Sequence, residues 1–201
     1  MKLNLANKLT IFRIILVPIM IIITFFDIPG EFLGIHTTAW ILNIIFIIAS
    51  ITDKLDGYIA RSRNQITTFG KFLDPIADKI LVITAMIILV EMGKLPAWIP
   101  TIVVFREFLV SGYRLVAIEK GGQVIAASIW GKLKTVTQMI AIIFAFIDNN
   151  SFGTIFTGSL TNGYEIAINA ITTSMMIICT FATIFSGIDY LKGGKELLKD
   201  K

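Results

Sequence analysis

The sequence predicts an all-α integral membrane protein with six transmembrane helices and a short N-terminal interfacial helix. Three observations support this fold class: apolar residues make up 55% of the 201 positions, the mean hydropathy is +0.80, and long apolar runs recur from one end to the other. A soluble core of this size needs far fewer apolar residues. Because no polar linker divides the chain, we expect one membrane domain over residues 1–201.

Each predicted span is an apolar run long enough to cross a bilayer and bounded by polar or turn-forming residues. The first run ends near Pro29, the third ends near Gly93, and the fourth starts near Pro96 and Trp98. The six predicted spans cover residues 12–28, 38–60, 70–92, 96–118, 130–148 and 167–190.

The segment before the first span mixes basic and apolar residues. Lys2 and Lys8 lie among Leu3, Leu5 and Leu9, a composition typical of a short helix that lies along the membrane surface over residues 1–11. No small-residue cleavage site follows the first apolar run, so we expect the run to be retained rather than removed as a signal peptide.

Basic residues predict the orientation. They gather before span one, between spans two and three, between spans four and five, and at the C-terminus, whereas the opposite loops are mainly acidic. The basic residues concerned are Lys2, Lys8, Arg13, Arg61, Arg63, Lys71, Arg114, Lys120, Lys132, Lys134, Lys192, Lys195, Lys199 and Lys201. The positive-inside rule therefore predicts a cytoplasmic-membrane protein with both termini in the cytoplasm. Because the basic residues are divided among loops, we expect no binding of nucleic acid.

Four aspartates interrupt the apolar chain in two runs with helical spacing. The first run is Asp53-x-x-Asp56-Gly57-x-x-Ala60-Arg61, and the second, after eight residues, is Gly70-x-x-x-Asp74-x-x-x-Asp78. Steps of three and four residues place each run on one helix face, so two helices present four carboxylates toward one place. An Asp at the centre of a membrane helix costs about 3 kcal/mol on insertion scales, so the cluster needs a compensating cation.

A divalent metal ion is the best candidate for that cation. Carboxylate oxygens without nearby His or Cys favour hard ions, so we expect two ions of Mg²⁺ or Mn²⁺, with Ca²⁺ and Zn²⁺ as open alternatives. The single Cys179 excludes an internal disulfide and a cysteine metal cluster. The small residues Gly57, Ala60 and Gly70 let a phosphate-bearing ligand approach the helix backbone, and a diphosphate fits this description.

The aspartate pattern resembles the signature of the CDP-alcohol phosphatidyltransferase family, whose members are integral membrane enzymes with six helices. All fixed residues of that signature are present at matching spacing. The segment Asn7-x-x-Thr10-x-x-Arg13 resembles the N-terminal part of the family. The pair Arg106-Glu107, together with Arg114 and the run Gly131-Lys132-x-Lys134-Thr135-x-x-Gln138, resembles the branch that uses glycerol 3-phosphate as the acceptor. The last span and residues 149–163 receive no role from this resemblance.

The resemblance implies a definite reaction and a homodimeric enzyme. The 1-hydroxyl of glycerol 3-phosphate attacks the lipid-side phosphorus of CDP-diacylglycerol and gives phosphatidylglycerophosphate and CMP. Asp53, Asp56 and Asp74 correspond to metal ligands, and Asp78 corresponds to a ligand that is also the general base. Neighbouring carboxylates raise the pKa of such a base and metal ions lower it, and the sequence leaves this balance open.

The same resemblance implies a site for CDP-diacylglycerol. Its expected residues surround the nucleotide and the diphosphate: Asn7, Thr10, Gly57, Ala60, Arg61, Thr67 and Gly70. Arg61 also fits a simpler role as an anchor at the membrane edge. It lies one helical turn beyond Gly57, however, and so on the same face as the motif.

The phosphate of the acceptor is expected to bind Arg106, Arg114, Lys132 and Lys134, since Arg is suited to a bidentate grip on phosphate. Arg106 lies ten residues into its span, so it needs an anionic partner. Glu107 is adjacent and points about 100° around the helix, so we expect it to be poorly placed as that partner. Arg114, Lys132 and Lys134 also fit the role of interfacial anchors.

The sequence leaves two other functions open. One is a transferase of the same family that uses inositol phosphate, serine or phosphatidylglycerol as the acceptor. The other is a divalent-metal or proton-coupled transporter, since intramembrane carboxylates occur there too. The sequence shows none of the internal repeats that are typical of transporters.

Overall fold

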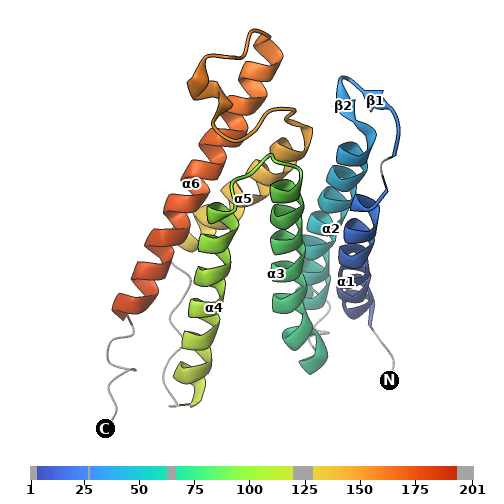
Figure 1. The fold of residues 1–201 in the computed structure, drawn as a ribbon. Helices are drawn as coiled ribbons and strands as arrows, with labels where there is room; N and C mark the ends of the chain where they lie inside the picture. The colour runs from blue at the N-terminus through green and yellow to red at the C-terminus, as the bar shows by residue number, and fades with distance from the viewer. Residues whose placement is uncertain (1–3, 27, 63–66, 120–128, 194–201) are drawn as a thin grey trace. The chain divides into compact units, whose positions relative to one another are not determined.

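The computed structural model describes residues 4–26, 28–62, 67–119 and 129–193, except for the side chains of residues 54, 56, 58, 60–62, 68, 69, 71, 118 and 193. The described chain is almost entirely helical (Figure 1), which confirms the predicted all-α class. Its elements are α1 (Leu5–Thr24), β1 (Glu31–Phe32), β2 (Ile35–His36), α2 (Thr37–Ser62), α3 (Thr68–Glu91), α4 (Trp98–Glu119), α5 (Ile129–Ile147), η1 (Thr154–Thr157) and α6 (Gly163–Gly193).

Each predicted span falls on one of the six long helices, but α1 differs from the prediction. It begins at Leu5 rather than at residue 12, because the side chain of Asn4 accepts a hydrogen bond from the backbone N–H of Asn7 at 2.9 Å and caps the helix. The prediction of a separate interfacial helix over residues 1–11 is wrong for the described residues. No glycine or proline lies between Leu5 and Pro18, so nothing separates this segment from the apolar run that follows.

Three helices in the described part of the chain are long and apolar enough to cross a membrane: α1, α5 and α6 up to Lys192. The N-terminal part of α2, Thr37–Asp53, is a shorter apolar helix. Charged residues interrupt the apolar character of α3 and α4. Those that belong to the motifs predicted to carry function are Asp74, Asp78, Arg106, Glu107 and Arg114. The six-span topology therefore stays a prediction.

The chain divides into two compact units, and the first comprises residues 1–94 and 145–149. Here α1 packs against both α2 and α3 (Figure 1). The buried positions of α1 recur every three or four residues from Ala6 to Met20, the stripe expected of a helix with one packed face. Strands β1 and β2 are joined by Leu33 and Gly34, whose φ values of 54° and 73° suit a tight two-residue hairpin turn.

A partly buried lysine follows α3 in this unit. The helix ends in a Schellman motif: Gly93 has φ +70°, and the backbone N–H of Lys94 donates to the carbonyl of Leu89. The Lys94 Nζ donates to the carbonyl oxygen of Phe146 at 2.7 Å. Desolvation by burial lowers the pKa of Lys94 to about 8, and the carboxylate of Asp148 acts in the opposite direction.

The second unit comprises residues 95–144 and 150–201. In it α4 packs against α6, and Val110, Tyr113 and Tyr190 form a buried cluster. Asn169 of α6 fixes the segment that contains η1, because its Oδ1 accepts a hydrogen bond from the backbone N–H of Ile155 at 2.8 Å. The single domain over residues 1–201 stays a prediction.

Candidate active site

The polar face of α1 is the first part of the candidate site. Asn7, Thr10 and Arg13 follow one another at steps of three residues and are all buried. Each step advances the helix by about 300°, so the three side chains share one face. Buried polar groups need partners, and those partners come from α2, from α3 and from the residue that precedes α3.

Two aspartates of the predicted motif meet this face. Arg13 Nη1 lies 2.6 Å from Asp53 Oδ1, and the hydroxyl of Thr10 donates to Asp74 Oδ1 at 2.8 Å. The Arg13 side chain has no exposed surface, whereas the Asp53 side chain is 33% exposed. The structure thus brings carboxylates from the two predicted aspartate helices to one side of α1.

The start of α3 is joined to the same face through Thr67. The Thr67 hydroxyl accepts a hydrogen bond from the backbone N–H of Gly70 at 3.0 Å, which caps the helix, and it donates to Asn7 Oδ1 at 3.0 Å. A Cβ added at Gly70 would come within 3.0 Å of Asn7 Oδ1 and 3.2 Å of Thr67 Oγ1. Glycine at this position therefore permits the close approach of Asn7 and Thr67.

The remaining residues of the aspartate motif are described only in part. Asp78 is half-buried on α3, and Gly57 is half-buried on α2. The side chains of Asp56, Ala60 and Arg61 lie outside the described part of the structure. Among the side chains that are described, no group of three or more potential His, Cys, Asp or Glu metal ligands is found. The four-aspartate metal site stays a prediction.

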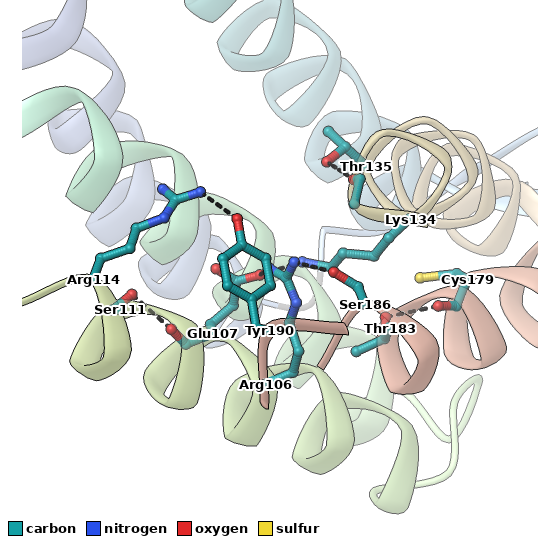
Figure 2. Close-up of polar contacts among 11 residues, drawn as sticks. Arg106, Glu107, Ser111, Arg114, Lys134, Thr135, Cys179, Thr183, Ser186 and Tyr190 are labelled. Atoms are coloured by element: carbon teal, nitrogen blue, oxygen red, sulfur yellow. Dashed lines mark hydrogen bonds and ion pairs between the residues drawn. The ribbon is translucent and has the colours of Figure 1, made fainter. Parts of the chain in front are cut away.

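A second cluster of charges lies in the other unit, around Glu107 of α4 (Figure 2). Arg106 Nη1 donates to Glu107 Oε1 at 3.0 Å, and Lys134 Nζ of α5 donates to the same oxygen at 2.5 Å. The prediction that Glu107 is poorly placed to pair with Arg106 is therefore wrong. The two Cβ atoms do point in different directions, but the long side chains converge beyond the helix surface. Arg106 Nη2 also donates to the hydroxyl of Ser186.

The other predicted acceptor residues occupy different positions. Arg114 Nη2 donates to the hydroxyl of Tyr190 at 2.8 Å, and Figure 2 shows the Tyr190 ring beside both Arg106 and Arg114. Lys132 is exposed on α5, whereas Lys134 is buried. Side chains two residues apart on a helix point about 200° away from each other, so Lys132 and Lys134 lie on different faces of α5.

Sequence reasoning missed several partners of these residues. The Asn7, Thr10 and Arg13 spacing was a usable signal for Arg13 as the partner of Asp53, since one helix face carried all three. Ser186 and Tyr190 had no comparable signal, because isolated Ser and Tyr residues in an apolar helix form no pattern. Only the structure brings them to Arg106 and Arg114.

Comparison with known proteins assigns this chain to a family. Residues 3–186 match the family model described as CDP-alcohol phosphatidyltransferase, so the match takes in both compact units. The chain belongs to the CDP-alcohol phosphatidyltransferase family. This confirms the resemblance drawn from the aspartate pattern.

Two relatives cover almost the whole chain, and both are named CDP-diacylglycerol–glycerol-3-phosphate 3-phosphatidyltransferase. The protein from Bacillus subtilis (strain 168) is 39% identical, with 98% of this chain and 97% of the relative covered. The protein from Haemophilus influenzae is 37% identical, with 100% and 98% covered. CDP-alcohol phosphatidyltransferases are membrane enzymes that generally depend on a divalent metal ion.

Proposed function

We propose that this protein transfers the phosphatidyl group of CDP-diacylglycerol to glycerol 3-phosphate. The acceptor's 1-hydroxyl oxygen forms a bond to the lipid-side phosphorus, the bond from that phosphorus to the CMP oxygen breaks, and CMP leaves. The observation that carries the proposal is the match of nearly the full chain to two relatives named for this activity. The polar face of α1, joined to Asp53 and Asp74 of the family motif, supports it independently.

The residues of the motif fit a hard divalent cation. Asp53 and Asp74 supply oxygen donors, and their contacts with Arg13 and Thr10 fix one oxygen of each carboxylate. Asp53, Asp56, Asp74 and Asp78 would hold the metal, with two ions of Mg²⁺ or Mn²⁺ suited to four carboxylates. When bound, the metal neutralises the charge of the diphosphate and of the leaving CMP.

The lipid nucleotide would bind along the face of α1 and the adjoining helix segments. We assign this role to Asn7, Thr10, Gly57, Ala60, Arg61, Thr67 and Gly70. The support for it is the hydrogen-bonded contact of Asn7 with Thr67 and the close packing at Gly70, which join residues separated by about sixty positions in the chain. A glycine and an alanine one helical turn apart on α2 leave the backbone accessible to phosphate oxygens.

Proton removal from the acceptor hydroxyl is assigned to Asp78. It follows Asp74 by one helical turn and so lies on the same face of α3. A carboxylate placed beside the attacking hydroxyl accepts the proton as the new bond to phosphorus forms. The CMP phosphate, which is charged at neutral pH, needs no proton to leave.

The acceptor phosphate would bind the cations of the second unit, Arg106, Arg114 and Lys134, with Lys132 at the surface. The shared ion pair with Glu107 offsets part of this positive charge but leaves the cluster cationic. A guanidinium can bind two phosphate oxygens at once, which suits a phosphomonoester better than a neutral alcohol. This cluster therefore favours a phosphorylated acceptor over serine or phosphatidylglycerol.

For the membrane arrangement we retain the six-span topology with both termini and the aspartate motif facing the cytoplasm. Glycerol 3-phosphate and CMP are water-soluble, so a cytoplasmic active site suits the substrates. The basic loops support this orientation through the positive-inside rule. A homodimer is the assembly that we expect from the family.

The test is a CMP-release assay with purified protein, CDP-diacylglycerol and a panel of acceptors. We expect release to require glycerol 3-phosphate and to be slow or absent with serine, inositol phosphate, phosphatidylglycerol or no acceptor. Mass spectrometry of the lipid product should find phosphatidylglycerophosphate. If CMP release is faster with another acceptor, that compound takes the place of glycerol 3-phosphate as the proposed substrate. If no acceptor gives CMP release, the proposal of phosphatidyl transfer is refuted.

A further inference from the structure

The last helix, α6, received no role from the sequence, yet its C-terminal turns contact both arginines of the cation cluster. Ser186 accepts a hydrogen bond from Arg106, and Tyr190 accepts one from Arg114. A Cβ added at Gly187 would lie 3.6 Å from Cγ of Arg106, so the stem of that arginine runs against the backbone of α6. Ser186 and Tyr190 are one helical turn apart and lie on the same face.

Both arginines lie beside the ring of Tyr190 (Figure 2). The Cζ of Arg106 lies 5.7 Å from the centre of the ring, and the Cζ of Arg114 lies 5.6 Å from it. Both distances fall within the range of a cation–π interaction. The ring therefore attracts two guanidinium groups that would otherwise repel each other.

Packing fixes the position of the ring. Tyr190 is only 2% exposed and forms a buried cluster with Val110 and Tyr113 of α4. A side chain held in this way has few accessible rotamers, so it can set the positions of longer and more flexible side chains. Arg106 is further restrained by its ion pair with Glu107.

The charges of the cluster suit a dianionic phosphate. Arg106, Arg114 and Lys134 contribute three positive charges, and Glu107 contributes one negative charge through the oxygen that Arg106 and Lys134 share. The excess of two positive charges matches a phosphomonoester near neutral pH. Tyr190 adds no charge, but it keeps two of the cations within reach of a single ligand.

We propose that Tyr190 is a positioning residue for the acceptor: its ring and hydroxyl hold Arg106 and Arg114 in the arrangement that binds the phosphate of a phosphorylated alcohol. The proposal rests on the proposed function, since it assigns the role of α6 in the acceptor site of that reaction. It predicts that changes at Tyr190 alter the recognition of phosphate and leave the recognition of CDP-diacylglycerol unchanged.

Two variants separate the contributions of Tyr190, and a third is a matched control. Tyr190→Phe keeps the ring and removes the hydroxyl that pairs with Arg114, whereas Tyr190→Leu removes both. Tyr113→Phe removes a hydroxyl from the same buried cluster, where that hydroxyl has no hydrogen-bond partner among the described residues. We expect the KM for glycerol 3-phosphate to rise about three- to tenfold in Tyr190→Phe and on the order of tenfold or more in Tyr190→Leu.

The KM for CDP-diacylglycerol should stay within about twofold of wild type in all three variants, since none of them changes the first unit, which contains the aspartate motif. Tyr113→Phe should match wild type for both substrates. Equal rises in both KM values, or Tyr190 variants that match Tyr113→Phe, would overturn the proposal. If Tyr190→Leu does not fold, Tyr190→Phe decides the question by the same criteria.

A binding measurement that needs no turnover distinguishes this inference from the proposed function. Inorganic phosphate should raise the thermal unfolding temperature of the wild-type protein and of Tyr113→Phe in detergent, and it should raise that of Tyr190→Phe less at the same concentration. No CMP release from wild type would refute the proposed function while this phosphate effect still supported the site. Equal stabilisation of all the variants by phosphate would refute the role of Tyr190.

Discussion

The ion pair between Arg13 and Asp53 allows a quantitative test of how α1 is held to α2 in the first unit. The guanidinium is fully buried, the carboxylate is one-third exposed, and their N–O distance is 2.6 Å. The two partners are therefore unequal: water can solvate Asp53 when Arg13 is lost, but it cannot reach Arg13 when Asp53 is lost. We expect Asp53→Asn to destabilise the protein more than Arg13→Met.

The expected magnitudes follow from this difference in exposure. Removing one partner of a buried ion pair costs about 3 to 5 kcal/mol, and Asp53→Asn should fall in that range because the buried guanidinium loses the carboxylate that lies 2.6 Å from it. Arg13→Met should cost about 1 to 2 kcal/mol, since the methionine refills the apolar space and the carboxylate keeps some water. In the double variant the two losses should fall short of additivity by about 1 to 3 kcal/mol.

The assay is reversible unfolding in mixed detergent micelles, with a chelator present so that metal binding does not contribute. Lys8→Met is the matched control, because Lys8 is an exposed cation on the same helix; its free energy of unfolding should stay within about 0.5 kcal/mol of wild type. Equal losses in Asp53→Asn and Arg13→Met, or strict additivity in the double variant, would refute the coupling.

Four further outcomes are expected. Chelation and Asp56→Asn should each abolish CMP release, because the diphosphate then loses the charge that neutralises it; full activity in chelated enzyme would contradict this. Asp78→Asn should lower kcat by on the order of a hundredfold while CDP-diacylglycerol still binds, as expected for loss of a general base. If binding disappears and kcat at saturation survives, Asp78 is a ligand only. Arg106→Ala should raise the KM for glycerol 3-phosphate by roughly thirty- to a thousandfold and barely change that for the lipid nucleotide; equal effects on both would move the acceptor site toward Arg114. The lowered pKa of Lys94, about 8, predicts that stability rises as pH increases from about 8 toward 10.5, because the unfolded state binds more protons in that window. Lys94→Met should lose this slope in thermal unfolding measured across that pH range, and an unchanged slope would assign it to another group.

Helix positions and the aspartate faces were predictable from the sequence because both depend on local periodicity. Apolar runs located the six long helices of the described chain, and steps of three and four residues placed the aspartates on one face of each of their two helices. The contacts of Asp53 and Asp74 with α1 come from the structure. The ends of the helices were less predictable. An apolar run shows only which residues can lie in lipid, whereas the ends of a helix are set by caps and turns. Asn4 caps the start of α1, and the turn at Gly93 ends α3.

The partners of the charged residues depended on side-chain reach, which the pattern does not encode. A helical-wheel angle between adjacent Cβ atoms placed Glu107 away from Arg106, yet both side chains are long enough to meet at 3.0 Å. Tyr190 was missed for a different reason. Its role arises from tertiary contact between α4 and α6, and a single tyrosine at the end of an apolar helix carries no periodic signal.

The polar contacts of α1 link the stability of the first unit to its proposed chemistry. Within lipid, apolar side chains give little drive for helices to associate, so close packing and interhelical polar contacts carry more of that role. Arg13 with Asp53 and Thr10 with Asp74 join α1 to α2 and α3 by such contacts. The same two carboxylates are proposed metal ligands, so they would take part both in metal binding and in the association of the helices. A bound cation would compete with Arg13 for Asp53 or share it, and in either case occupancy of the metal site would alter how firmly α1 is held to its neighbours.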